Sequence, residues 1–248
     1  MKTLHEFLFP VQFPVQFPLT VGGKVTEQIL GIDISVWDDE NSTPQMFNFA
    51  KAKEAGANFA YIKSSQSYWM DQDFILNWDF ARRSGLPYGA YHYFTWDASP
   101  VRQMDFFWGL LKNNEGTLPP VIDYECRTKV PAQKTAITTL KNAAEYFTKI
   151  SGIVPMIYTG PGYWNEFGSQ DRYWLKYPLW IANYYKKAPT IPLPWNTYLF
   201  WQFTDKLDGI KFGGEAKELD GNYFNGTVQQ LQNLMKPSIL CPLCGHVI

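Results

Sequence analysis

Carboxylic acids near the ends of apolar segments are the residues in this sequence best suited to chemistry. Asp123 and Glu125 lie two positions apart in the string VIDYE, and side chains two apart in a strand point to the same face. Two carboxyl groups held that close cannot both ionise cheaply, so the pKa of one should rise toward neutrality. A glutamic acid with a raised pKa is the general acid that glycoside cleavage requires. We therefore predict a hydrolytic site around Asp123 and Glu125.

Two further carboxyl groups occupy comparable positions, Asp33 in GIDIS and Asp220 in ELDGNYF. In a parallel barrel the catalytic groups lie at the carboxyl ends of the strands, so all four acids are candidates for one catalytic site. An aspartate near a strand end can also simply cap the next helix, which is an equal alternative for Asp33 taken alone. Burying the Asp123–Glu125 pair without a function would cost several kcal/mol.

Aromatic residues make up 17% of the chain, with ten Trp. Flat rings with an apolar face and a polar edge suit a sugar-binding cleft, although many must also fill the core. The substrate-binding candidates near predicted strand ends are Tyr61, Tyr93, Tyr158, Trp180, Tyr184 and Trp201. His92 in YGAYHYF is a further candidate as a proton shuttle, and the alternative is a buried, hydrogen-bonded histidine.

Apolar runs and helical stretches alternate through the first half of the chain. Buried strands are predicted at 29–36, 59–64, 88–94, 119–124, 154–159, 178–183 and 197–203. Helices are predicted at 43–55, 73–84, 100–113 and 131–150, three of which are followed by a glycine that can end a helix. This order indicates right-handed βαβ units and a parallel sheet.

The predicted fold class is α/β, an irregular TIM-like β/α barrel. Its βα units are regular in the first half, and its second half, after residue 160, is poor in helices. The alternative is a doubly wound open sheet, but no glycine-rich phosphate loop follows the first predicted strand.

The chain is predicted to form one catalytic domain with an extension at each end. Residues 1–28 contain the tandem FPVQFPVQFP, whose prolines forbid helix and central strand, so they should form an extended arm. Residues 29–235 form the barrel and residues 236–248 a tail. The phenylalanines of the arm are too many for a solvated linker and suggest docking on the barrel, on a second copy of the chain or on a virion protein.

Charge and cysteine content exclude several classes of function. The net charge of −1 gives no footprint for nucleic acid, and no segment is long and apolar enough to span a membrane. Cys241 and Cys244 make only half of a zinc site, so neither a metal nor a cofactor is expected. The N-terminal apolar run is broken by Glu6 and Pro10, so no signal peptide is predicted.

A series of short strings resembles the family 25 glycoside hydrolases, the muramidase lysozymes of fungi, bacteria and bacteriophages. Each string is weak alone, but their shared order from Ile29 to Leu234 is specific. They are GIDIS with Trp37, AKEAGANFAYIKSSQS, the Asp71–Phe74 step with Ala81 and Gly85, GAYHYF, VIDYE, IYTG, WIANY, WQFTD and LDGNYF. The sequence departs from the family at Asp38-Asp39-Glu40, where a Gln-Gly type of turn is usual, and at Ser67, where a glycine is common.

The resemblance implies hydrolysis of the β-1,4 bond between N-acetylmuramic acid and N-acetylglucosamine. It matches Glu125 to the proton donor and Asp123, Asp33 and Asp220 to the other acidic positions. Asp123 would raise the pKa of Glu125 and orient the substrate's acetamido group, whose oxygen could attack the anomeric carbon. Alternatively, Asp33 or Asp220 would activate a water on the opposite face.

Two other functions remain open at this point. A chitinase-like hydrolase also ends a strand with Asp-x-Glu, but Pro119, Pro120 and Val121 stand where its further acids would be. A non-catalytic glycan-binding barrel is disfavoured because all four acids are present. The expected partner is the peptidoglycan strand of the bacterial cell wall, reached after holin-type release or as part of a virion.

Overall fold

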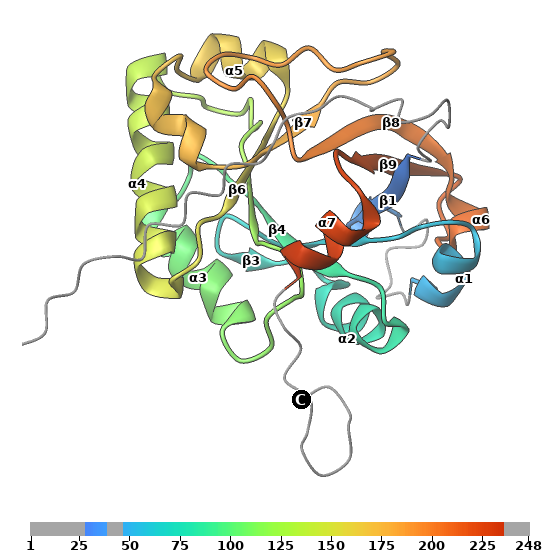
Figure 1. The fold of residues 1–248 in the computed structure, drawn as a ribbon. Coiled ribbons are helices and arrows are strands. Elements are labelled where there is room, and N and C mark those ends of the chain that lie inside the picture. Colours follow the sequence, from blue (N-terminus) through green and yellow to red (C-terminus); the bar gives the residue numbers. More distant parts are fainter. Residues whose placement is uncertain (1–27, 39–46, 236–248) are drawn as a thin grey trace, which may run out of the picture.

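The computed structural model describes residues 28–38 and 47–235 (Figure 1). Its strands are β1 (Ile29–Ile34), β2 (Ala60–Gln66), β3 (Trp69–Met70), β4 (Tyr88–Tyr93), β5 (Val121–Asp123), β6 (Met156–Thr159), β7 (Leu179–Ala182), β8 (Phe200–Asp208) and β9 (Glu218–Phe224). Its helices are α1 (Phe49–Glu54), α2 (Phe74–Ser84), α3 (Pro100–Leu111), α4 (Gln133–Ser151), α5 (Pro161–Phe167), α6 (Gly209–Phe212) and α7 (Val228–Leu234), with 3-10 helices η1 (Val36–Asp38) and η2 (Arg172–Lys176).

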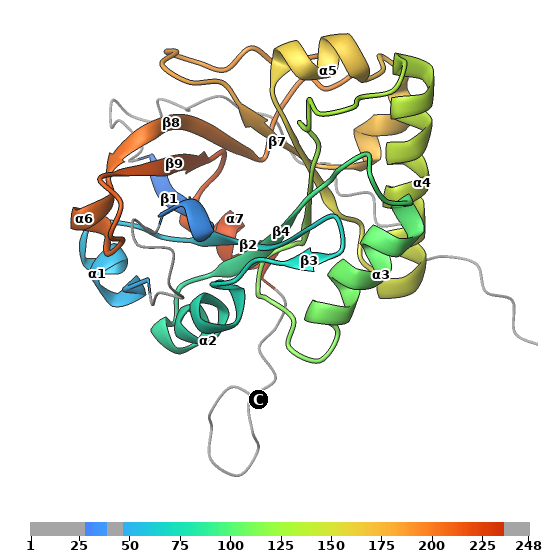
Figure 2. The ribbon, with the colours of Figure 1, turned by 180° about the vertical axis from the view of Figure 1, so that it is seen from behind.

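The strands close into a barrel. Strands β1, β2, β4, β5, β6, β7 and β8 pair in parallel in that order. Strand β9 then pairs antiparallel with both β8 and β1 and completes the ring, while β3 is appended to β2 (Figure 2). The predicted irregular barrel is thus confirmed, and the closed ring excludes the doubly wound open sheet.

The seven predicted strands are all present, and the regular first half is confirmed by α2, α3 and α4. The predicted helix 43–55 was wrong at its start: residues 43–46 lie outside the described part, and α1 begins only at Phe49 after Asn48, whose side chain accepts the Lys51 N–H. Neither β9 nor the short β3 was predicted as a strand. The predicted arm, except residue 28, and the predicted tail also lie outside the described residues.

Alternation along the strands separates two apolar clusters. Outward side chains such as Ile32, Ile122 and Ile157 pack against the helices. Inward side chains from the starts of the strands form a second cluster inside the barrel, which we call the floor. Its members are Ile29, Phe59, Tyr61, Leu118, Val121, Met156, Tyr158, Trp180, Leu199, Phe200 and Phe224, with Leu231 of α7.

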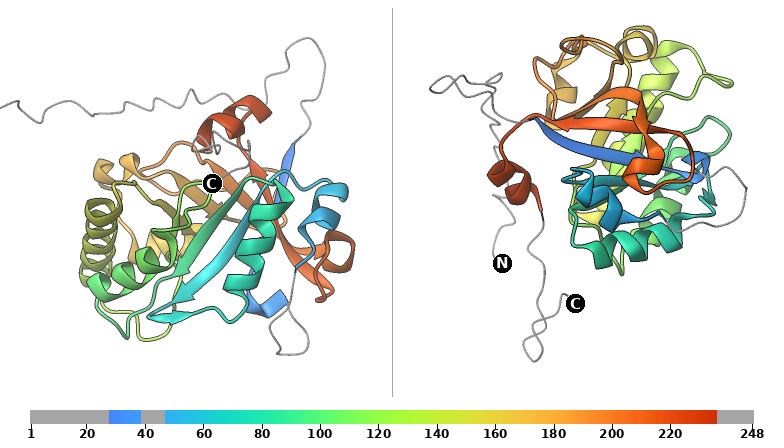
Figure 3. Two further views of the ribbon diagram at one scale, coloured as in Figure 1. Left: turned by 90° about the horizontal axis from the view of Figure 1, so that it is seen from below. Right: turned by 90° about the vertical axis from the view of Figure 1, so that its right-hand side faces the viewer.

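The floor is closed at one end of the barrel and leaves the other end to polar groups. Helix α7 lies beside the start of β1, and η1 lies at the opposite end (Figure 3). Gly31 and Gly89 face inward, where an added Cβ would collide with the rings of Phe59 and Tyr61. The rings therefore occupy the space that side chains at these two positions would take.

Candidate active site

The four predicted carboxyl groups gather inside the barrel at the end where the parallel strands have their carboxyl ends, which we call the mouth; Asp220 lies near the start of the antiparallel β9. Asp33 on β1 lies in register with Asp220 on β9. Asp123 is the last residue of β5, and Glu125 follows two positions later. Asp33 and Asp123 are both buried, and Glu125 and Asp220 are half-buried. Glu125 lies beyond the end of β5, yet it stays close enough for its charge to act on Asp123.

Gln202 of β8 joins two of the acids. Its Nε2 donates to Asp33 Oδ2 and to Asp220 Oδ2, both at 2.9 Å. Asn222 of β9 donates a second hydrogen bond to Asp33 Oδ2 at 2.7 Å. Sequence reasoning missed Gln202 and Asn222. Gln202 is a polar residue within an apolar strand, the signal that singled out Asp123, whereas Asn222 lies on β9, which was not predicted as a strand.

Tyrosine hydroxyls fix the orientation of the Gln202 amide. Tyr158 and Tyr184 each donate to Gln202 Oε1 at 2.7 Å, so the amide nitrogen must face the two aspartates. Trp180 acts in the same way on Asn222, because its Nε1 donates to Asn222 Oδ1 at 2.8 Å. Tyr158 and Trp180 of the floor, with Tyr184, therefore fix the amide donors that face the acids.

Burial and mutual repulsion give Asp33 and Asp220 different pKa values, so the two acids differ in charge at neutral pH. Desolvation raises the pKa of Asp33 to about 6, opposed by hydrogen bonds from Asn222 and Gln202. Desolvation followed by the charge of Asp33 raises the pKa of Asp220 to about 9. At neutral pH Asp33 is therefore mainly ionised while Asp220 keeps its proton.

The pKa of Glu125 is raised to about 7, as a general acid near neutrality requires. The cause differs from the prediction: desolvation comes first and the charge of Asp33 second. The predicted repulsion acts on Asp123 instead, because burial, followed by the charge of Glu125, raises the pKa of Asp123 well above its ordinary value. Within this pair, the more deeply buried Asp123 is the harder acid to ionise.

Asp123 has one oxygen that no described residue satisfies. Its Oδ1 is buried and has no hydrogen-bond partner among the described residues. A buried polar atom left unpaired costs free energy, so such atoms are rare and often mark a site where a ligand supplies the partner. An N–H or O–H group of a bound molecule would meet this need.

Lys63 of β2 is a charged residue at the mouth that sequence reasoning missed. It is buried, donates to Gln66 Oε1 at 3.2 Å and lies 5.2 Å from the ring centre of Tyr93. Its charge lowers the pKa of both Asp123 and Glu125. This cation therefore partly offsets the repulsion within the acidic group.

The aromatic candidates divide among three places. Tyr93, Tyr158 and Tyr184 lie near the acids, whose charges raise the pKa of each hydroxyl further after burial. Tyr61 and Trp180 are fully buried in the floor, with ring centres 4.7 Å apart. Trp180 reaches the acids only through Asn222, and Tyr61 donates to the carbonyl of Pro119.

His92 and Trp201 point away from the mouth, so His92 fits its alternative as a buried, hydrogen-bonded histidine and Trp201 does not line the acidic group. His92 is fully buried, hydrogen-bonds Ser65 at 2.8 Å and Gln103 at 3.2 Å, and stacks on Phe107 of α3. Desolvation lowers its pKa to about 4. Trp201 packs in the outer cluster and donates to the Asn183 carbonyl. Both occupy outward positions of strands that are apolar on both faces.

Two departures from the family pattern have visible consequences at the mouth. Asp38 accepts the Ser35 N–H at 2.7 Å, and its burial raises its pKa to about 7. Ser67 has a φ of 55°, a left-handed conformation that favours glycine. Its hydroxyl donates to Asp97 at 2.8 Å. The tryptophan beside Asp38, Trp37, is 81% exposed.

Other classes of site are not found in the described part of the chain. No group of three or more His, Cys, Asp or Glu residues there could hold a metal ion. No helix there is long and apolar enough to cross a membrane. Cys241 and Cys244 lie outside the described residues.

Comparisons with known proteins agree with this geometry. The model of the family "Glycosyl hydrolases family 25" matches residues 32–210. Lysozyme M1 of Streptomyces globisporus is 32% identical over 86% of this chain and 73% of its own length. The N,O-diacetylmuramidase of Chalaropsis sp is 28% identical over 83% of this chain and 98% of its own. A Streptomyces coelicolor lysozyme structure superposes with a TM-score of 0.72 at 27% identity, covering 84% and 97% of the two chains.

Proposed function

Because this chain belongs to family 25 of the glycosyl hydrolases, we propose that the acids at its mouth hydrolyse the β-1,4 bond between N-acetylmuramic acid and N-acetylglucosamine. The chain is a glycoside hydrolase that acts on peptidoglycan. The observation that carries the site assignment is Glu125, a half-buried acid whose pKa is raised to about 7 beside three further acids. Such a group holds a transferable proton near neutral pH.

In the first step, Glu125 protonates the glycosidic oxygen as the bond to the anomeric carbon breaks. The unpaired Oδ1 of Asp123 accepts the acetamido N–H of the muramic acid residue, so that the acetamido oxygen attacks the anomeric carbon and forms a cyclic oxazolinium. In the second step, ionised Glu125 takes a proton from water, and the water oxygen opens the ring. The proton donated in the first step is thus regained, and the anomeric configuration is retained.

A second mechanism uses Asp33 to activate water directly. Asp33 is the acid that the Gln202 and Asn222 amides hold in its ionised form. Attack by that water opposite the leaving group would invert the configuration. Proton NMR of the freshly released reducing end separates the two mechanisms, because retention supports the acetamido route and inversion supports Asp33.

The identity of the cleaved bond is tested by digesting purified peptidoglycan, reducing the new ends with borohydride and identifying the reduced sugar. Reduced muramic acid is expected, whereas reduced glucosamine would refute the proposed bond. Chitin serves as the second substrate and should be cut far more slowly, which also tests the chitinase-like alternative. Glu125→Gln is the control, and it should lower the rate by about a hundredfold or more while the protein still binds the glycan. A variant with near-normal turnover would contradict the role of Glu125.

The way this enzyme reaches the cell wall is a further proposal. We infer holin-type release or carriage in a virion, as a bacteriophage member of this family would require, and docking of residues 1–28 on the barrel, a second copy or a virion protein from their phenylalanines. Deleting residues 2–28 should lower Tm or change the oligomeric state while activity on soluble glycan fragments persists. Unchanged melting and elution would refute the docked arm.

A further inference from the structure

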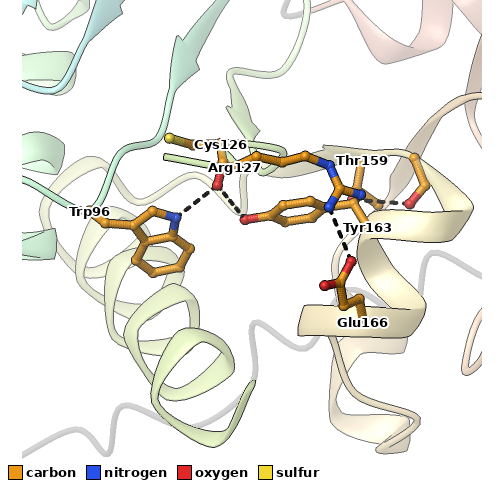
Figure 4. A network of polar contacts seen from close by, with 7 residues as sticks. Trp96, Cys126, Arg127, Thr159, Tyr163 and Glu166 are labelled. Atoms are coloured by element: carbon orange, nitrogen blue, oxygen red, sulfur yellow. Dashed lines mark hydrogen bonds and ion pairs between the residues drawn. The ribbon is translucent and has the colours of Figure 1, made fainter. Parts of the chain in front are cut away.

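The backbone just after Glu125 is held by an unusual pair of hydrogen bonds. The carbonyl oxygen of Cys126 accepts one from Trp96 Nε1 at 2.9 Å and one from the Tyr163 hydroxyl at 2.8 Å (Figure 4). Both lone pairs of this oxygen are therefore used by side chains. Neither donor was identified from the sequence, and neither belongs to the acidic group at the mouth.

The two donors come from different connections of the barrel. Trp96 follows β4, and Tyr163 lies on α5 after β6. Between them the ring of Tyr124 packs edge-on against both, with ring centres 5.8 Å from Trp96 and 5.1 Å from Tyr163. The Tyr124 hydroxyl donates to the Phe167 carbonyl at 2.9 Å. Three consecutive βα connections thus meet around the residues that flank Glu125.

Glu125 depends on this backbone for its placement. Among the described residues, none donates a hydrogen bond to its carboxyl group, although the amide of the preceding residue, Tyr124, donates to the Tyr158 carbonyl at 2.8 Å. The chain is therefore fixed on both sides of Glu125, by the sheet at residue 124 and by Trp96 and Tyr163 at residue 126. A side chain without bonds of its own takes its position from these anchors.

The same anchor directs the next side chain. Arg127 lies with its guanidinium carbon 5.3 Å from the ring centre of Tyr163 and pairs with Glu166 of α5 at 3.1 Å. Its charge lowers the pKa of Glu125. A turn of the backbone at Cys126 would therefore move the acid and this neighbouring cation together.

We propose that Trp96 and Tyr163 are positioning residues for Glu125: by holding the Cys126 carbonyl, they keep the acid at its half-buried place in the mouth. This inference rests on the proposed function of Glu125 as the proton donor. Displacement of a catalytic group by about 1 Å lowers the rate, because the group must lie within hydrogen-bond distance of the glycosidic oxygen to transfer its proton.

Tyr163→Phe tests the proposal with the loss of a single oxygen. We expect kcat to fall about tenfold with KM nearly unchanged, since the substrate contacts remain. The alkaline limb of the pH–rate profile should move to lower pH, because a less constrained Glu125 loses part of the desolvation that raises its pKa. The double variant with Trp96→Phe should lose more activity than either single variant, since the Cys126 carbonyl then has neither side-chain donor.

Trp78→Phe is the matched control. It removes another tryptophan bond to a backbone carbonyl, from Trp78 Nε1 on α2 to Asn114 at 3.0 Å, and neither residue belongs to the acidic group at the mouth. This variant should lower Tm and leave kcat and the pH profile unchanged. If Tyr163→Phe behaves in the same way, Trp96 and Tyr163 only stabilise the fold and the proposal is wrong.

A measurement independent of turnover separates this proposal from the proposed function. Titration of ¹³C-labelled glutamate carboxyls by NMR gives the pKa of Glu125 in the wild type and in Tyr163→Phe. A lowered pKa in the variant supports the positioning role even if peptidoglycan is not cut where we expect. An identical pKa together with an unchanged rate overturns the positioning role and leaves the function intact.

Discussion

The floor and the mouth occupy the same barrel and are built by the same strands, yet they obey opposite rules. In the floor, the ring of Phe200 packs against those of Phe59 and Tyr61 with ring centres 4.9 and 5.5 Å apart, and burial stabilises the fold. At the mouth, burial raises the pKa of every member of the acidic group, so it costs stability. The comparison teaches that the stability supplied by the floor offsets the cost of burying the acids at the mouth.

The largest effect is expected from Phe200→Ala in the floor. Phe200 is fully buried and contacts Phe59, Tyr61 and Phe224, so the cavity should lower the free energy of unfolding by about 3–5 kcal/mol. Urea denaturation measures this loss, and kcat of the folded enzyme should stay near normal. Phe203→Ala, on the outer face of the same strand and only half-buried, should cost clearly less. Equal losses at both positions would contradict the special role of the floor.

Next in size is the pH dependence of stability caused by the mouth. The pKa of Asp220 is about 9 in the fold and near 4 when unfolded. Between these values the unfolded chain releases a proton that the folded chain keeps, so stability falls as pH rises. Tm should therefore decrease from about pH 5 to about pH 8. Asp220→Asn should flatten this decrease and add about 2 kcal/mol of stability at the higher pH.

The control for that experiment is Asp79→Asn on the exposed side of α2. Asp79 pairs with Arg82 and Arg83, and these partners lower its pKa, the opposite of Asp220. This variant should leave the decrease between acidic and neutral pH in place. A wild-type Tm that rises with pH over this range would show that the acids at the mouth are not desolvated.

A smaller effect concerns the charges around Glu125. Asp33 raises and Lys63 lowers the pKa of Glu125, so Asp33→Asn should move the alkaline limb of kcat/KM to lower pH and Lys63→Met should move it to higher pH. A displacement of about one pH unit is expected in each case. If the alkaline limbs of the two variants moved in the same direction, a group other than Glu125 would control the profile.

The smallest effect is expected at Ser67, beside the mouth. Ser67→Ala keeps the unfavourable positive φ and loses the hydrogen bond to Asp97, and should cost about 1 kcal/mol. Ser67→Gly loses the same bond but relieves the backbone, so its net change should be near zero. Thermal denaturation of the two variants gives the comparison, and a glycine variant less stable than the alanine variant would refute the strain.

The sequence predicted the floor and the mouth unequally, and the reason lies in the barrel itself. The four acids were recognisable because a charge in an apolar strand is costly and therefore conspicuous. Which apolar residues face inward was not recognisable, since the strands of a barrel are buried on both faces and their sequences show no alternation of polar and apolar residues. Trp201 was placed among the substrate-binding candidates for this reason, and Gln202, one residue from Trp201, was overlooked.

The second half of the fold was harder to predict than the first. In the regular βα units of the first half, glycines mark the ends of helices. Gly85 and Gly152 do so in left-handed conformations. Strand β9 lacks such a signal, because it contains charged and small residues and runs antiparallel. Its place between β8 and β1 depends on pairing with a strand from the other end of the barrel, and local sequence carries no information on that partner.

The closing position of β9 has a consequence for the order of synthesis. A ribosome makes β1 before the other strands and β9 after them, while the two strands lie side by side in the finished barrel. A nascent chain that already contains Glu125 therefore still lacks Asp220, Asn222 and one wall of the ring. Translation thus delays assembly of the acidic group until the chain has emerged through β9.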